Sequence, residues 1–333
     1  MKKVKLGEVC EIVTGSTPKS TNPDYWNGEY KWITPAEISD DDFIIVDTQR
    51  KISKLGIEKT GLKSFPMGTV LLSSRAPIGK VAIAGCEMYC NQGFKNFICS
   101  NEINNEYLYY FLKSRKNFLN NIGRGATFKE ISKSIISNIE IILSSYDVQC
   151  TQTQNLKKID NLIYLRKKVI KEYQLLVKSR FNEMFGDVIL NDKEWKISKW
   201  NEILTIRNGK NQKNVEDKNG QFPIYGSGGI IGYAKDWIVK KNSVIIGRKG
   251  NINKPILVRE NFWNVDTAFG LEPTLEKINS EYLFYFCQLY NFEKLNKAVT
   301  IPSLTKSDLL DISLPLPPLS LQDEFADFVA QVN

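Results

Sequence analysis

Apolar and polar positions follow the same order twice along the chain. In the first half, KLGEVCEIVTG leads to the strand-like run GTVLLSSRAPIGKVAI and then to NEYLYYF at residues 105–111. In the second half, KWNEILTIRNG, NSVIIGRKGNINKPILV and SEYLFYF at residues 280–286 come in the same order. The offset between matching segments falls from 194 to 173 residues, so the second copy has shorter loops. A repeat of this length exceeds any solenoid unit and predicts the duplication of a whole domain.

Each copy is predicted to open with a short helix that leads into a glycine turn, at Gly15 and at Gly209. The aromatic phrase of each copy is predicted to form a helix that faces the core, because Leu108, Phe111 and Leu112 recur at helical spacing. Such a helix begins best after a side chain that accepts a backbone N–H. The candidate caps are Asn104 or Asn105 in the first copy and Asn279 or Ser280 in the second.

The segment between the copies, residues 147–185, contains neither Gly nor Pro and repeats apolar residues every seven positions. This pattern predicts a long helix that packs against a partner helix along its length. The predicted seam consists of Leu156, Ile159, Ile163, Ile170, Tyr173, Val177 and Met184, with Arg166 and Arg180 interrupting it. At a rise of about 1.5 Å per residue, the helix is a rod of about 57 Å that holds two domains apart. A helix folded back onto one domain is the alternative. Gly186 is a plausible stop.

The absence of histidine excludes several classes of enzyme. Imidazole bases, Ser-His-Asp and Cys-His nucleophiles and His-containing zinc sites are all impossible. The net charge of +8 is typical of a protein that meets polyanions over part of its surface, although many ordinary cytoplasmic proteins share it. No apolar run approaches the roughly 20 residues of a membrane span, and no signal peptide is visible, so a cytoplasmic protein is expected. The six scattered cysteines are expected to be reduced.

Several segments together resemble the specificity subunits of prokaryotic type I restriction-modification systems. They are GSTPKSTNPDYWNGEYKWITPAEI, SSRAPIGKVAI, IDNLIYLRKKVIKEYQLLVKSRFNEMFGD, IYGSGGIIGY, GRKGNI and LPLPPLSLQDEF. The resemblance implies an α+β fold with two homologous, mixed α/β target recognition domains, separated by a long conserved coiled-coil-type helix in a pseudo-twofold arrangement. It also implies that each domain reads one half of a bipartite DNA site. Half-sites on one face of a duplex lie about 34–36 Å apart, so a stiff spacer is needed to fix their phase.

The resemblance implies a DNA-recognition subunit that does no chemistry itself. The implied partners are double-stranded DNA, modification (methyltransferase) subunits and restriction (translocase and nuclease) subunits. S-adenosylmethionine, ATP and Mg would be bound by those subunits, so this chain is expected to bind no cofactor and no metal.

The predicted domain boundaries follow the repeat. They are residues 1–146 for target recognition domain 1, 147–187 for the spacer helix, 188–317 for target recognition domain 2 and 318–333 for the start of a second conserved helix. The second helix is predicted to begin near Ser320. A complete repeat would continue it for 20 or more residues beyond Asn333, so this helix is expected to be truncated. The apolar stripe of the spacer helix would then lack its full intramolecular partner, which predicts self-association or dependence on another subunit.

Candidate DNA contacts lie in loops marked by Gly or Pro, at matching places in both copies. Arg and Lys suit guanine edges, Asn and Gln suit adenine, and small hydroxyls suit phosphates. The first copy offers Thr17, Lys19, Ser20, Asn22, Ser74, Arg75, Lys80, Arg124, Thr127 and Lys129. The second copy offers Lys210, Asn211, Lys213, Arg248, Lys249, Asn251, Ser303 and Thr305. For each residue the alternative is a solvated surface group. Arg75→Ala and Arg248→Ala are each predicted to weaken specific DNA binding.

Other functions stay open on the sequence alone. The specificity partner of a fused restriction-methylation enzyme would show the same repeats, and a fragmentary product would bind modification subunits without binding DNA. NPDYW resembles the Asn-Pro-Pro-aromatic motif of DNA adenine methyltransferases, but Asp24 replaces the second proline and no Gly-rich cofactor loop is visible. Cys86, Cys90 and Cys99 could together hold a zinc ion. The simpler interpretation is that they are isolated buried thiols.

Overall fold

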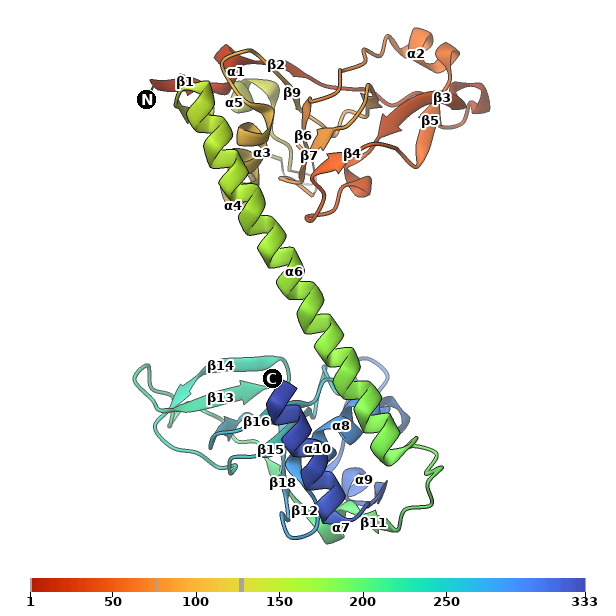
Figure 1. The fold of residues 1–333 in the computed structure, drawn as a ribbon, viewed down its shortest axis with the longest axis vertical. Coiled ribbons are helices and arrows are strands. Elements are labelled where there is room, and N and C mark those ends of the chain that lie inside the picture. Colours follow the sequence, from red (N-terminus) through yellow and green to blue (C-terminus); the bar gives the residue numbers. More distant parts are fainter. Residues whose placement is uncertain (1, 76, 126–128, 333) are drawn as a thin grey trace. The chain divides into compact units, whose positions relative to one another are not determined.

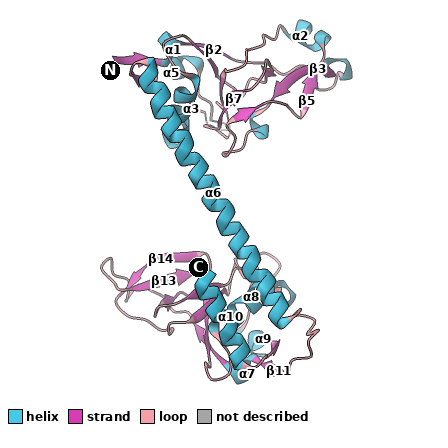
Figure 2. Cartoon of the chain, in the orientation of Figure 1, coloured by secondary structure: helices cyan, strands magenta, loops and turns pink. Residues whose placement is uncertain are grey.

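Two compact units make up the computed structural model, which describes residues 2–75, 77–125 and 129–332. Unit 1 is Met1–Leu165 and unit 2 is Arg166–Asn333 (Figure 1). Helix α6, Tyr146–Phe185, begins in unit 1 and ends in unit 2 (Figure 2). The prediction of one long helix between the two copies is therefore confirmed. The finer division of the chain at residues 146, 187 and 317 stays a prediction.

Unit 1 is built on a five-stranded sheet in the order β2-β9-β6-β7-β4. Its strands are β2 Cys10–Val13, β9 Asn96–Cys99, β6 Val70–Leu72, β7 Val81–Ala84 and β4 Ile44–Ile45. A second sheet has the order β5-β3-β8, and its strands are β5 Arg50–Ile52, β3 Trp26–Ile33 and β8 Tyr89–Cys90. The unit is closed by the antiparallel pair β1 Lys2–Lys5 and β10 Glu140–Leu143. Its helices are α1 Leu6–Val9, η1 Pro23–Tyr25, η2 Pro35–Glu37, α2 Lys54–Thr60, α3 Asn105–Ser114, α4 Lys116–Ile122 and α5 Lys133–Ser137.

Unit 2 repeats this plan with a four-stranded sheet in the order β12-β18-β15-β16. Its strands are β12 Leu204–Asn208, β18 Ala268–Pro273, β15 Ser243–Gly247 and β16 Ile256–Val258. The second sheet, in the order β14-β13-β17, contains β14 Gly229–Ala234, β13 Phe222–Gly226 and β17 Trp263–Asn264. The closing pair is β11 Ile197–Lys199 with β19 Ser313–Pro315. The helices are α7 Trp200–Ile203, α8 Ser280–Leu289, η3 Phe292–Leu295, α9 Lys306–Leu310 and α10 Leu319–Val332.

The duplication extends to single hydrogen bonds. Gln149 and Gln322 are both fully buried, and the Oε1 of each accepts a bond of 2.9 Å from a backbone N–H, that of Asn104 in unit 1 and that of Asn279 in unit 2. The same two asparagines cap α3 and α8 with their side chains, as the sequence predicted. Buried amides keep such partners because an unpaired one is costly. The prediction of two homologous domains of mixed helix and sheet is confirmed.

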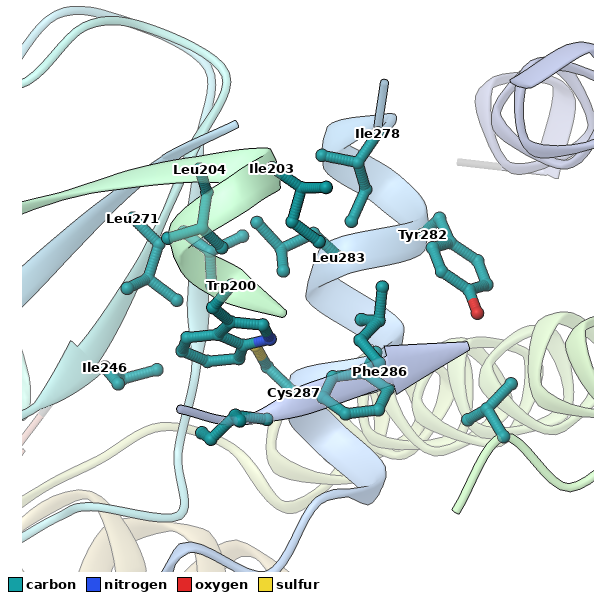
Figure 3. Close-up of a cluster of buried hydrophobic side chains, with 14 of the residues drawn as sticks. Trp200, Ile203, Leu204, Ile246, Leu271, Ile278, Tyr282, Leu283, Phe286 and Cys287 are labelled. Carbon is teal, nitrogen blue, oxygen red and sulfur yellow. The ribbon is translucent and has the colours of Figure 1, made fainter. Parts of the chain in front are cut away.

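Each unit has its own apolar core. The core of unit 2 gathers around Trp200, which lies among Ile246, Leu271, Leu283 and Cys287 between the sheet and α8 (Figure 3). Apolar side chains from the sheet and from α3 make the equivalent core of unit 1. Since each core is complete within its unit, each unit can hold its loops in place by itself.

The seam residues of α6 differ in exposure along the helix. Exposed fractions are 36% for Leu156, 52% for Ile159, 50% for Ile163, 49% for Ile170 and 48% for Tyr173, whereas Val177 and Met184 are buried at 3% and 8%. The buried end of the helix is part of the core of unit 2. The helix ends at Phe185, and Gly186, whose φ of +73° suits glycine, follows it as the predicted stop.

One local prediction is wrong. The opening helix does not lead directly into the glycine turn, because α1 is a single turn and the chain passes into strand β2 before it reaches Gly15. In the second copy, α7 passes into β12 in the same way. The strand forms because β9 supplies hydrogen-bond partners for it, and a sequence window of this length contains no sign of that neighbour.

Among the described residues, no helix has the length and apolar character that crossing a membrane requires.

Candidate nucleic-acid interface

In unit 1, two loops that are distant in sequence lie against each other beyond the end of β6. The N–H of Ser74 donates to the carbonyl of Gly93, and the carbonyl of Ser74 accepts from the N–H of Ile131. Arg124 and Glu130 exchange two backbone hydrogen bonds of 2.9 Å. These bonds hold the backbone of Ser74 against that of Gly93 and Ile131, and the backbone of Arg124 against that of Glu130.

Exposed basic side chains come from both of these loops. Arg75, Arg124 and Lys129 are exposed, whereas Lys80 is half-buried and its Nζ donates to the carbonyl of Pro35. Ser74 is fully buried, and its hydroxyl donates to the carbonyl of Gly93. The structure thus brings together most of the basic residues predicted here, and it removes Ser74 from direct contact with a ligand. Thr127 lies outside the described residues.

A carboxylate lies between two cations at this site. Glu130 accepts from Nε of Arg75 through Oε2 at 2.8 Å and from Nζ of Lys95 through Oε1 at 3.2 Å. Lys95 is only 7% exposed. Partial burial raises the pKa of Glu130, but the hydrogen bonds from Arg75 and Lys95 outweigh it and hold this pKa below its usual range.

Unit 2 builds the same pair of loops beyond the end of β15. The N–H of Arg248 donates to the carbonyl of Thr267 at 2.8 Å, and its carbonyl accepts from the N–H of Leu304 at 2.9 Å. Lys249 and Ser303 then face each other as an isolated bridge, as Arg75 and Glu130 do in unit 1. The backbone contacts therefore align Arg248 with Ser74 and Lys249 with Arg75.

The side chains at these aligned positions differ between the units. Phe269, two residues after Thr267, stands where unit 1 has Lys95, two residues after Gly93. The guanidinium of Arg248 lies 5.8 Å from the centre of the Phe269 ring. Ser303 replaces Glu130, so no carboxylate is present at this point. Lys249 and Asn251 are exposed, and Ser303 is half-buried.

A second loop in each unit follows the glycine that the sequence marks as a turn. A Cβ at Gly15 would lie 1.7 Å from the carbonyl oxygen of Cys90, and one at Gly209 would lie 1.8 Å from that of Val265, so both positions require glycine. A tryptophan anchors each loop: Trp32 donates to the carbonyl of Ser16, and Trp263 donates to that of Lys210.

The candidate residues of these glycine-marked loops are mostly exposed. Thr17, Lys19, Ser20, Lys210, Asn211 and Lys213 lie at the surface, and Asn22 is half-buried. Three of the candidates already have hydrogen-bond partners. Thr17 donates to the distant Gln92, Asn211 accepts from the N–H of Lys213, and Asn22 caps η1. The cap by Asn22 gives a structural reason for the NPDYW sequence. Thr305 likewise caps α9.

Metal binding finds no support in the part of the chain that the structure describes. No group of three or more Cys, Asp or Glu side chains is arranged there to hold an ion. Cys90 is buried, and burial raises the pKa of its thiol to about 12, which disfavours the thiolate that zinc requires. Asn96 donates to the sulfur of Cys90.

Two residues of the carboxylate cluster, Lys95 and Glu130, were missed by the sequence analysis. Lys95 follows the NQGF segment and reads as an ordinary surface lysine. The available signal was the position of Lys95 directly before the apolar strand β9, where a side chain points either to solvent or into the sheet. The alternation of residues along the strand does not determine whether the Lys95 side chain faces solvent or the sheet. Its burial depends on Glu130, which is 35 residues away.

The chain is similar to known proteins over nearly its whole length. The family model described as type I restriction modification DNA specificity domain matches residues 1–175 and 192–333. The MjaIX specificity subunit of Methanocaldococcus jannaschii, a type I restriction enzyme subunit, is 29% identical, and the match covers 98% of this chain and 85% of that protein. The EcoprrI specificity subunit of Escherichia coli is 23% identical over 95% of this chain and 84% of that one.

Solved structures support the fold. The S subunit of a type I restriction-modification system from M. genitalium matches with a TM-score of 0.61 at 18% identity, covering 99% of this chain and 88% of that one. A chain from a study of complex assembly and conformational transition in a type I restriction-modification system matches with a TM-score of 0.53, also at 18% identity, over 99% of this chain and 89% of that one.

Proposed function

The chain belongs to the type I restriction-modification DNA specificity family, and from that premise we propose that it reads a two-part DNA target, one part with the loops of each unit. It is a DNA target-recognition subunit and not an enzyme. The observation that carries the two-part proposal is the pair of loops held twice by the same backbone bonds, at Ser74 and at Arg248.

The loop pairs support DNA contact because they combine a fixed backbone with exposed cations. A backbone held by hydrogen bonds presents its side chains at set positions, which base recognition requires, while exposed Arg and Lys supply the attraction to phosphates. Different side chains on the same backbone, such as Arg75 and Lys249, then favour different half-sites.

Helix α6 is proposed to set the gap between the half-sites. Its 40 residues contain no Gly or Pro, so the connection between the units has no hinge within the helix. Inserting seven residues after Lys168 keeps the helical phase nearly constant and adds about 10 Å, which is about three base pairs. Because three base pairs also rotate the duplex by about 100°, the variant should lose its preference for the original gap, and an unchanged preference contradicts this role.

The proposed partners are the modification and restriction subunits of the same system. S-adenosylmethionine, ATP and Mg would be bound by those subunits, as the roles of methylation and DNA translocation require. The exposed apolar residues of α6, Leu156 to Tyr173, offer a surface for another subunit or for a second copy of this chain.

The proposal is tested by selection from random duplexes and by methylation mapping. The chain, assembled with the modification subunits of its own system, is used to select bound duplexes, and methylated adenines are mapped in DNA exposed to the same complex. A motif of two specified parts with a constant gap is expected. A single uninterrupted motif, or binding without sequence preference, contradicts the proposal. Methyl transfer by this chain alone would contradict its assignment as a non-catalytic subunit.

A further inference from the structure

In the cluster of Arg75, Glu130 and Lys95, only one of the three guanidinium nitrogens of Arg75 is hydrogen-bonded to the carboxylate. Nε of Arg75 donates to Glu130, whereas no hydrogen bond joins the terminal nitrogens of Arg75 to any other described residue. The guanidinium is therefore held at its inner edge. With respect to the described residues, the two terminal nitrogens remain a pair of donors at the exposed end of the side chain.

Glu130 is itself held from the other side. Its second oxygen accepts from Lys95, and the Lys95 side chain is 8% exposed, so its ammonium group cannot reorient freely in water. A buried ammonium group needs a charged partner, and the carboxylate supplies one. The three groups carry a net charge of +1, so the cluster stays attractive to DNA.

From this geometry we propose that Arg75 reads a guanine in the half-site of unit 1, with Glu130 as the residue that positions it and Lys95 as the anchor of Glu130. The inference rests on the proposed function. A pair of parallel N–H donors matches the O6 and N7 acceptors that guanine presents in the major groove. A guanidinium held at Nε loses less freedom on binding than a free one, so more of the hydrogen-bond energy goes into discrimination between bases.

Unit 2 provides an internal contrast. Lys249 stands at the position of Arg75, so the equivalent cation is a single ammonium group without paired donors. Ser303 stands at the position of Glu130 and Phe269 at that of Lys95, so no carboxylate from these positions holds this cation. Lysine binds phosphate as a point charge and discriminates bases less well. We expect Lys249 to contribute attraction without reading a base.

The experiment compares variants of the chain assembled with its modification subunits, on duplexes that carry the mapped motif and each of its single base-pair substitutions. Arg75→Ala and Arg75→Lys should both lose about 10- to 100-fold of the preference for one G·C pair in one half of the motif. Preferences in the other half should not change. Lys249→Ala, the matched control, should weaken binding to all duplexes alike and reduce the dependence of log affinity on log salt by about one charge.

Glu130→Gln tests the positioning role. It should reduce the preference at the same G·C pair by about 3- to 10-fold, because a neutral amide holds the guanidinium less firmly. Affinity for unrelated DNA should change by less than that factor. Glu130→Asp, which keeps the charge, should recover part of the preference. A uniform gain in affinity for all DNA after Glu130→Gln would show that Glu130 only reduces the positive charge, and would overturn the positioning role.

The outcomes separate the two proposals. If the parent complex shows no two-part motif, the proposed function fails. If the motif is present and Arg75→Ala lowers affinity equally for every duplex, or changes nothing, the guanine assignment fails and the proposed function stands. Arg75 is exposed, so its replacement should leave the fold intact, and an unchanged thermal transition checks this.

Discussion

The helices α3 and α8 have nearly the same sequence and different surroundings. In unit 2, Tyr282 and Phe286 are buried, and the rings of Phe181 and Phe185 lie 5.6 and 4.8 Å from that of Tyr282. Phe325 of α10 completes this aromatic group.

In unit 1 the matching residues, Tyr107 and Phe111, are half-exposed and line an open depression of about 430 Å³ together with Leu156 of α6. Gln152 stands at the place of Phe325, three residues after the matching buried glutamine. The sequence of a helix thus determines where it begins and which face is apolar, whereas its burial depends on what the rest of the chain brings to it.

The largest expected effect is the loss of the aromatic cover in unit 2. Phe185→Ala removes a fully buried ring from among Phe181, Tyr282 and Phe325, and should cost about 3–5 kcal/mol of the stability of unit 2. Hydrogen exchange read by mass spectrometry, in increasing denaturant, should show lost protection in α8 with α3 unchanged.

Phe111→Ala is the matched control in unit 1. Its ring is half-exposed, so the stability of unit 1 should fall by less than about 1 kcal/mol. Equal losses from Phe185→Ala and Phe111→Ala would mean that the two helices are equally buried in solution, and the contrast between the units would fail.

A medium effect, equal in the two units, is expected from the buried glutamines. Gln149→Leu and Gln322→Leu each leave the N–H of an asparagine and one or more carbonyl groups unpaired, which should cost about 1–3 kcal/mol in the respective unit. Gln154→Leu, at an exposed position of α6, should cost almost nothing. The stability of each unit is measured by denaturation. Similar losses of stability in the two variants would show that both glutamines play the same role, and unequal losses would show that the two units share only their backbone plan.

The smallest expected effect is a difference in acid sensitivity between the loop pairs. The pKa of Glu130 is lowered in the folded chain, so its contribution to stability is present above the usual carboxyl pKa and is lost as the pH falls through the lowered value. Ser303 makes no such contribution in unit 2. As the pH falls below the usual carboxyl pKa, the protection of amides near Ser74, corrected for the intrinsic exchange rate at each pH, should therefore fall more than the protection of amides near Arg248. In Glu130→Gln this difference should disappear, and its persistence would assign it to other carboxylates.

Much of the fold was predictable because its signals are local. Asn104 and Asn279 cap their helices with their own side chains, and the long segment without Gly or Pro is helical throughout. The duplication was visible because corresponding elements keep their order in the sequence. These features depend on neighbours a few residues apart, and a single sequence contains that information.

The candidate sites were less predictable because they depend on strand register and on distant partners. The sequence analysis placed Arg75 and Arg248 in matching loops, and the strand register then aligns Arg248 with Ser74 instead. The burial of Ser74 follows from a bond to Gly93, 19 residues away. The composition of a loop shows that it is basic. Which of its basic side chains reaches the surface depends on how the backbone of the loop pairs with neighbouring segments.

The aromatic cover of α8 also has a consequence for synthesis on the ribosome. Phe181 and Phe185 leave the tunnel about 100 residues before Tyr282, which is about 5–20 s at a translation rate of ~5–20 residues per second. For that time the rings of Phe181 and Phe185 can contact each other but lack their later partner Tyr282. Nascent chains should therefore bind chaperones through this aromatic pair, in a window that opens after unit 1 is complete and closes as α8 emerges.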